Sequence, residues 1–215
     1  MEEARAFLLS RKKMNLLITA VNIVVFLVFT IIGNTEDVSF MLEHGACYTP
    51  AILQGEYYRL VTGMFLHFGL YHLAYNMVCL IALGDVLETE TGSVRYLLIY
   101  FLGGIAGNLL SMALELRAAG YGFAELLSDG LPKAEALPAG STFAVSAGAS
   151  GAIFAVVGAL LYIVIRNKGR LGTITLQRLA LMAALSIAQG FTEVGTDNAA
   201  HIGGFAAGFL LAVAL

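Results

Sequence analysis

Six apolar blocks, separated by polar links, are the feature of this 215-residue sequence that most restricts its fold. Each block is long enough to cross the hydrocarbon core of a bilayer as a helix, which takes about 20 apolar residues. A soluble fold would need polar residues to cover the blocks, but only 13% of the chain is charged, about half the share of a typical soluble domain. The pattern therefore predicts an all-α membrane protein whose six transmembrane helices form one bundle. The blocks are residues 16–32, 60–83, 96–116, 145–165, 173–189 and 199–215.

The distribution of charge is more informative than the net charge of −3. Basic residues precede the first block and surround the link between the fourth and fifth blocks, which predicts that both regions are cytoplasmic. We therefore expect residues 1–15 to be a cytoplasmic N-terminal segment and residues 16–215 to be one multi-pass domain in a bacterial plasma (inner) membrane, with a cytoplasmic C-terminus. No basic stripe suggests a nucleic-acid partner. The basic residues are Arg5, Arg11, Lys12, Lys13, Arg166, Lys168, Arg170 and Arg178.

Three links lie outside in this topology. Residues 33–58 mix charged and apolar side chains, as expected of a segment that lies partly in the membrane interface. Residues 117–141 are rich in glycine and proline and predict an irregular loop, with one short helix near 123–127. The link 191–198 is the shortest candidate lid over the outer ends of the second, fourth and sixth blocks.

Five polar side chains occupy positions that a membrane helix normally avoids: His67, His72, Asn76, Ser150 and His201. Such residues are costly inside a bilayer and usually serve a function. The predicted topology places all five in the external half of the membrane, on the second, fourth and sixth blocks. His72 and Asn76 are one helical turn apart on the same face. His67 is about 140° away from His72 around an ideal helix, so we expect it at the helix entrance and outside this cluster.

Small residues predict how the fourth and sixth blocks meet. In the fourth block, Gly148 and Gly151 flank Ser150 at a predicted helix start. In the sixth block, His201 and Gly204 lie on one helical face, where glycine lets a neighbouring backbone approach closely. We therefore expect the two helices to pack together and to bring Ser150 into contact with His201.

A serine beside a histidine is the pair that nucleophilic catalysis requires, because the imidazole accepts the hydroxyl proton during attack. The helix N-terminus at Ser150 supplies free N–H groups for an oxyanion, and His72 and Asn76 could add side-chain donors. No buried carboxylate is placed to orient His201, so the sequence predicts a dyad.

The same residues are open to other interpretations. Each residue alone fits a cap, a helix contact or an interfacial group. A zinc site formed by His67, His72 and His201 lacks the spacing of a zinc-protease helix. A transporter or proton channel would place charged groups near mid-membrane, whereas Glu115 fits the interface better. We therefore expect no metal and no cofactor.

Three motifs resemble those of the rhomboid family, over about Tyr57 to Leu215. They are His67-Phe68-Gly69-Leu70-Tyr71-His72-Leu73-Ala74-Tyr75-Asn76, Gly148-Ala149-Ser150-Gly151, and Ala200-His201-Ile202-Gly203-Gly204 followed by Gly208. Tyr58-Arg59 is similar to the Trp-Arg pair that ends the family's first external loop.

The resemblance implies a six-helix bundle that cleaves peptide bonds within or beside transmembrane segments of other membrane proteins. It implies Ser150 and His201 as the dyad, and the Ser150 N–H, His72 and Asn76 as the oxyanion hole. Phe154 stands where many relatives carry a tyrosine that stacks on the histidine. The 191–198 link and the outer end of the fifth span are implied as a substrate gate. A catalytically inactive rhomboid-like protein that binds membrane clients, and a small-molecule transporter, remain the alternatives.

Overall fold

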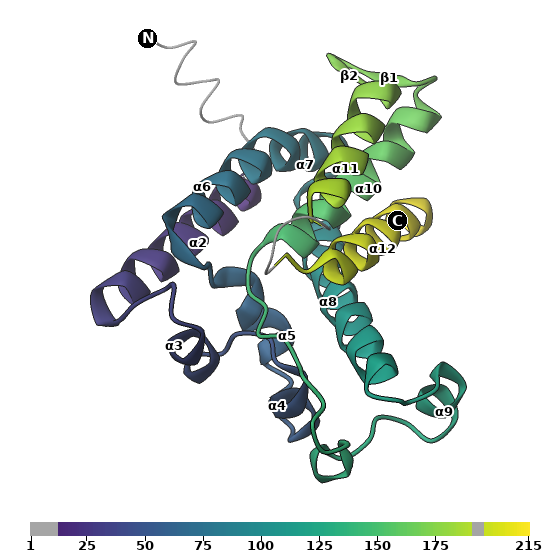
Figure 1. Ribbon diagram of the computed structural model, residues 1–215. Coiled ribbons are helices and arrows are strands. Elements are labelled where there is room, and N and C mark those ends of the chain that lie inside the picture. Colours follow the sequence, from purple (N-terminus) through teal and green to yellow (C-terminus); the bar gives the residue numbers. More distant parts are fainter. Residues whose placement is uncertain (1–12, 191–195) are drawn as a thin grey trace.

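The computed structural model describes residues 13–190 and 196–215 and is predominantly helical (Figure 1). Three helices are long and apolar enough to cross a membrane: α2 (Lys13–Ile32), the continuous helix Gly69–Thr91, and α8 (Ser93–Ala118). Three shorter apolar helices are α10 (Ser150–Arg166), α11 (Leu176–Gly190) and α12 (Asn198–Ala214). The predicted helical class is confirmed. The number of membrane crossings remains a prediction, because α11, with 15 residues, is shorter than the usual span of about 20.

Short elements connect these helices. The helix Gly69–Thr91 consists of α6 (Gly69–Cys79), a π-helical turn η2 (Leu80–Gly84) and α7 (Asp85–Thr91). The remaining elements are α3 (Val38–Glu43), α4 (Thr49–Leu53), α5 (Arg59–Thr62), η1 (Gly63–Phe65), α9 (Phe123–Ser128), η3 (Ala134–Ala136), β1 (Arg170–Leu171) and β2 (Ile174–Thr175). The short helix predicted near 123–127 is therefore present as α9.

The structure shows where three of the predicted blocks become membrane helices. In the second block, the short helices α5 and η1 cover residues 59–65, and the membrane helix begins only at Gly69, where φ is +74° and the chain turns. The fourth block was given from residue 145, but its helix begins at Ser150, as predicted for that residue, and the extended chain before it pairs with the link 33–58 through Cys47 and Ser146. The fifth block was expected from residue 173, but the antiparallel hairpin of β1 and β2 precedes α11. In the fourth and fifth blocks, non-helical backbone forms hydrogen bonds where hydropathy alone indicated a helix.

The helices α8, α10 and α12 form the core of the bundle. Most residues of α10 are buried, from Gly151 to Leu160 without interruption. The contact with α12 is made by backbone: a Cβ atom on Gly204 would overlap the carbonyl oxygen of Gly151, and one on Gly208 would overlap that of Ala155. The predicted packing of the fourth block against the sixth is therefore confirmed.

A buried carboxylate joins the first helix to the rest of the bundle. Glu88 on α7 is fully buried and accepts hydrogen bonds from the N–H groups of Met14, at 3.2 Å, and Asn15, at 2.9 Å. These N–H groups belong to the first turn of α2, which has no helical acceptors for them. The hydroxyl of Ser93 donates a third bond to Glu88, at 2.6 Å. The start of α2, the end of α7 and the start of α8 are thus fixed at one end of the bundle.

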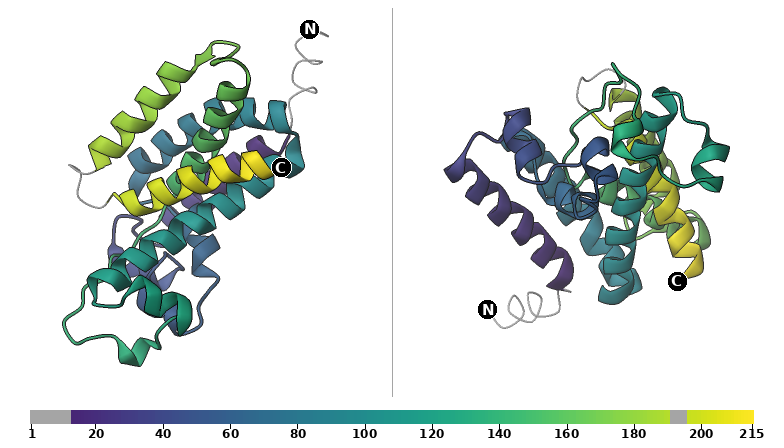
Figure 2. Two further views of the ribbon diagram at one scale, coloured as in Figure 1. Left: turned by 90° about the vertical axis from the view of Figure 1, so that its right-hand side faces the viewer. Right: turned by 90° about the horizontal axis from the view of Figure 1, so that it is seen from below.

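The two ends of the bundle carry different structures. The hairpin of β1 and β2 lies at one end, whereas α4 and α9 lie at the other, together with the chain that leads into α10 (Figures 1 and 2). At the hairpin end, residues from the end of α7, the start of α8 and the ends of α10 and α12 line a cavity of about 330 Å³. The short helices of the first two links predicted to be external, α4 and α9, therefore share one end.

The close approach of α10 and α12 leads us to a prediction about the stability of the fold. Gly208→Ala should lower the free energy of unfolding by about 2 kcal/mol, because the new methyl group displaces a backbone and not a flexible side chain. Gly122→Ala is the matched control, since the nearest atoms to its added Cβ are 3.9 Å away. Thermal unfolding of both variants in the same detergent provides the comparison. Equal midpoints for the two variants would contradict backbone contact between the helices.

Candidate active site

Ser150 and His201 meet where α10 contacts α12. Ser150 is the first residue of α10, and His201 lies in the first turns of α12, 51 residues later. The distance between Ser150 Oγ and His201 Nε2 is 2.9 Å, which is a hydrogen bond. The glycine contact between the helices lies directly beside this pair, because Gly151 follows Ser150 and Gly204 is about one turn after His201. The structure thus brings together the two residues that the sequence predicted to meet.

The imidazole of His201 is held by packing. The ring stacks on Phe154, with 4.4 Å between the ring centroids and 17° between the planes. Its Nδ1 is buried and has no hydrogen-bond partner among the described residues. The nearby carboxylate of Asp197 is bound elsewhere, since it accepts bonds from the Ala200 N–H, at 2.9 Å, and the Ser111 hydroxyl, at 2.7 Å. The arrangement is therefore a serine and a histidine without a hydrogen-bonded third member in the described part of the chain.

His72 lies beside the residues that precede Ser150. A Cβ atom on Gly148 would be 2.8 Å from Cε1 of His72, and φ at Gly148 is +138°, so this position requires glycine for both space and conformation. The N–H of Gly148 donates to the carbonyl oxygen of Gly63, at 2.8 Å. The imidazole of His72 is thus in contact with the backbone immediately before the serine.

His67 lies at the entrance of the helix, as predicted, but it is not outside the polar cluster. It is almost fully buried, and its ring contacts that of His72 edge-on, with 5.2 Å between centroids. Its Nε2 also accepts a long hydrogen bond, 3.4 Å, from the N–H of Ala149. The ideal-helix estimate separated the two histidines, but His67 precedes the turn at Gly69 and is not helical. His67 therefore belongs to the cluster and contacts the backbone before Ser150.

Asn76 is buried on α6, one turn after His72. Its Nδ2 donates to the carbonyl oxygen of His72, at 2.8 Å. An amide NH₂ has two hydrogens, so this bond leaves one of them free to donate to another group. Asn76 is thus oriented along its own helix while it retains a donor.

A buried arginine holds the first external link over this region. The guanidinium of Arg59 donates to the carbonyl oxygens of Leu42, at 2.7 Å, and Ala46, at 2.8 Å. It also forms an ion pair with Glu56, at 2.6 Å. Hydrogen bonds from Tyr58 and then Arg59 lower the pKa of the Glu56 carboxyl. The Tyr58-Arg59 pair noted in the sequence therefore closes the loop against its own backbone.

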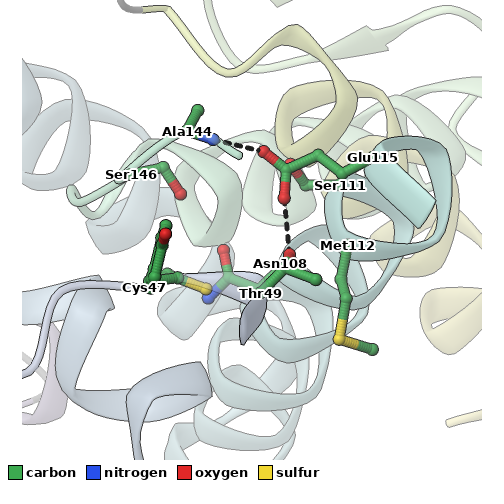
Figure 3. A pocket seen from close by; sticks show the side chains of 9 residues that line it. Cys47, Thr49, Asn108, Ser111, Met112, Glu115, Ala144 and Ser146 are labelled. Atoms are coloured by element: carbon green, nitrogen blue, oxygen red, sulfur yellow. Dashed lines mark hydrogen bonds between the residues drawn. The ribbon is translucent and has the colours of Figure 1, made fainter. Parts of the chain in front are cut away.

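Glu115 is the residue of this region that the sequence interpretation missed. Its interfacial position remains a prediction, and the structure adds that it is half-buried and accepts hydrogen bonds from the Thr49 hydroxyl and the Ala144 N–H (Figure 3). A signal was present, because Asn108, Ser111 and Glu115 follow one another at three- and four-residue spacing and so share a face of α8. A polar stripe of this kind faces protein and not lipid.

Two further predictions bear on the site. Among residues 13–190 and 196–215, no three His, Cys, Asp or Glu side chains are grouped to hold a metal ion. Most of the lid proposed at 191–198 lies outside the described residues. Residues 196 and 197 lead into α12, which begins at Asn198.

Comparison with known proteins identifies the family. The family model described as Rhomboid domain matches residues 54–215. The chain is 32% identical over 213 residues to "Rhomboid protease GluP" of Bacillus subtilis, which covers 99% of this chain and 37% of that relative. It is 34% identical over 166 residues to "RHOMBOID-like protein 4" of Arabidopsis thaliana, covering 74% of this chain and 34% of the relative. "Putative rhomboid protease YdcA" of B. subtilis is 28% identical over 164 residues, 76% of this chain and 70% of the relative.

The chain spans about a third of the length of the first two of these relatives, 37% and 34%. The match nevertheless includes the whole region from α5 to α12, with both Ser150 and His201. With its long apolar helices, the chain is an integral membrane protein that belongs to the rhomboid family.

Proposed function

We propose that this protein is an intramembrane serine endopeptidase that uses Ser150 as nucleophile and His201 as general base. The observation that carries the proposal is the 2.9 Å hydrogen bond between Ser150 Oγ and His201 Nε2 at the start of α10. Relatives named as rhomboid proteases support the same reaction class. The proposed substrates are transmembrane proteins in the same bilayer, cut within or next to their membrane segments, without cofactor or metal.

The chemistry follows from the positions of the two side chains. His201 Nε2 takes the proton of Ser150 as Oγ attacks the peptide carbonyl carbon. The same proton then passes to the leaving amine nitrogen as the C–N bond breaks. A water molecule hydrolyses the resulting acyl ester, and its proton returns through His201 to Ser150. Phe154 keeps the ring plane fixed during these transfers, in the place that a hydrogen-bonded carboxylate takes in a triad.

The oxyanion of the tetrahedral intermediate needs donors fixed before the reaction begins. We propose the Ser150 N–H, His72 and the free hydrogen of the Asn76 amide for this role. The start of α10 also contributes the positive end of its helix dipole. Gly148 leaves the space that His72 occupies, and Gly151 and Gly204 set the distance between the two helices that carry the dyad.

A transmembrane substrate reaches a buried serine only if part of the bundle wall opens. We propose that α11 and the link at 191–198 form this gate. α11 makes far fewer contacts with the rest of the bundle than α10 does, and most of its side chains from Leu176 to Ala188 are not buried. Substrates with glycine or other helix-weakening residues near the cut should be preferred, because an extended backbone has to enter the site.

The first prediction from this proposal concerns the pair of Ser150 and His201. Ser150→Ala and His201→Ala should each abolish cleavage to the same extent as the double variant, because the two residues act as one unit. Purified variants in liposomes with a panel of single-span substrates give the rates, and a fluorophosphonate probe should label the wild type but not Ser150→Ala. Full cleavage by a folded Ser150→Ala variant would refute the mechanism. Substrate binding without cleavage by the wild type would instead indicate an inactive client-binding protein.

The second prediction concerns the oxyanion donors. Asn76→Ala should lower kcat by about 10²- to 10³-fold without abolishing it, as expected when one oxyanion donor is lost. Asn22→Ala is a matched control, because Asn22 is buried on α2 and its Nδ2 donates to the Ile18 carbonyl oxygen, at 2.8 Å, in the same i to i−4 manner. Equal losses of kcat in the two variants would show that Asn76 only supports its helix.

The third prediction concerns orientation, which we propose to be cytoplasmic for the hairpin end of the bundle and external for α4 and α9. Single cysteines at Asn167, beside the hairpin, and Ser128, on α9, are both exposed positions. In a variant without Cys47 and Cys79, a membrane-impermeant maleimide added to intact cells should label Ser128→Cys and spare Asn167→Cys. The reverse labelling pattern would invert the topology.

A further inference from the structure

We propose that Glu115 is a positioning residue for the catalytic pair: it fixes the chain segment that carries Ser150. The inference rests on the proposed function and adds a residue to it. Glu115 lies near the outer end of α8, outside the glycine contact and distant in sequence from both motifs. Its carboxylate accepts hydrogen bonds from two separate segments of the chain, at Thr49 and Ala144 (Figure 3).

The first of these contacts reaches the nucleophile through the backbone. Ala144, whose N–H donates to Glu115 at 2.8 Å, begins the extended segment that ends at Ser150. Two residues later, Ser146 exchanges backbone hydrogen bonds with Cys47, at 2.8 and 2.9 Å. The carboxylate of Glu115 thereby connects the start of this extended segment to the long helix α8. Displacing Ala144 would therefore displace the backbone that leads into α10.

The second contact secures the other strand of this pairing. Thr49 begins α4, two residues after Cys47, and its buried hydroxyl donates to Glu115. One carboxylate thus holds both partners of the Cys47–Ser146 pairing from the same side. These groups, together with Asn108 and Met112, surround a cavity of about 10 Å³, so there is little space for the segment to shift without losing a hydrogen bond.

The same face of α8 also holds the helix of the base. Ser111, one turn before Glu115, donates to the carboxylate of Asp197, at 2.7 Å. Asp197 caps α12 by accepting from the Ala200 N–H, at 2.9 Å, and its carbonyl oxygen accepts from the His201 N–H, at 3.1 Å. The outer end of α8 therefore positions Ser150 through Glu115 and His201 through Ser111. The distance between Oγ and Nε2 depends on both connections.

The magnitude of the effect follows from catalytic geometry. A displacement of about 1 Å at a catalytic group costs about 10²-fold in rate, and a buried donor left without its acceptor favours such a displacement. Glu115→Ala should lower kcat by about 10- to 100-fold while KM changes less than about 2-fold, because the residue touches no substrate. Glu115→Gln should recover most of the activity, since its amide oxygen can accept from Ala144 and its NH₂ can donate to the Thr49 hydroxyl.

The kinetic experiment compares four variants with the wild type in liposomes. Thr49→Val replaces the side chain by one of nearly the same shape and removes one of the two hydrogen bonds to Glu115, so it should give an intermediate loss of kcat. This variant tests the proposal even if Glu115→Ala fails to fold. Glu125→Ala is the control, because Glu125 is an exposed external glutamate that accepts only from its own helix, at the Gly122 N–H. Wild-type kcat in Glu115→Ala or Thr49→Val would overturn the proposal, as would a failure of Glu115→Gln to exceed Glu115→Ala.

A measurement without catalysis separates this inference from the proposed function. Cys47 lines the same cavity, and burial raises the pKa of its thiol to about 12, so it should react slowly with maleimides. In a Ser150→Ala, Cys79→Ala background, Glu115→Ala should increase alkylation of Cys47 by about tenfold or more, and Glu115→Gln and Glu125→Ala should leave it unchanged. If the wild type cleaves nothing while this pattern holds, the protease proposal fails and the role of Glu115 in fixing the segment stands. Unchanged alkylation in Glu115→Ala would overturn that role.

Discussion

The close contact between α10 and α12 is the constraint on which the rest of the structure depends. Inside a bilayer, apolar surface gains nothing by leaving lipid for protein, so helices associate through close packing and hydrogen bonds. Gly204 and Gly208 allow the backbone of α12 to rest directly on carbonyl groups of α10. Because the two backbones are so close, the side chains of Ser150 and His201 reach each other and form a hydrogen bond across the interface. The helix contact thus fixes the chemical geometry and the fold at once.

Non-helical backbone at the end of the bundle that carries α4 and α9 imposes a second requirement. Irregular chain at membrane depth is tolerated only where its polar groups are bonded within the protein. The segment before Ser150 meets this condition through Cys47, Gly63 and Glu115, and the loop before it does so through Arg59. Protein groups here form the hydrogen bonds that water would form with an exposed loop. These hydrogen bonds hold the segment that leads into α10, and with it the Ser150 N–H, at a fixed place.

Local patterns in the sequence predicted the parts of the structure that are governed by helix periodicity. The meeting of Ser150 with His201 followed from glycine spacing, and α9 followed from turn residues around a short apolar run. The contact of His67 with His72 was not predicted, because helical angles were applied across Gly69, where the helix begins with a positive φ. The partners of Glu115, Thr49 and Ala144, could not be predicted because they are 66 and 29 residues away. Hydropathy also cannot show that apolar chain, such as that before Ser150, is extended, since the deciding backbone hydrogen bonds are non-local.

The π turn at Leu80–Gly84 has a consequence for how this helix can vary among related chains. A π turn contains one residue more than an α turn, so it rotates everything that follows by about 100°. In the helix Gly69–Thr91 this turn lies between Asn76, at the end that carries Ser150 and His201, and Glu88, which meets the start of α2. Deleting one residue of the turn would leave an ordinary α-helical turn, with Asn76 and Glu88 still in place. Closing the turn into an α-helix without a deletion would instead rotate Glu88 by about 100° away from α2. The extra residue in the turn, more than the composition of the helix, therefore sets the relation between its two ends.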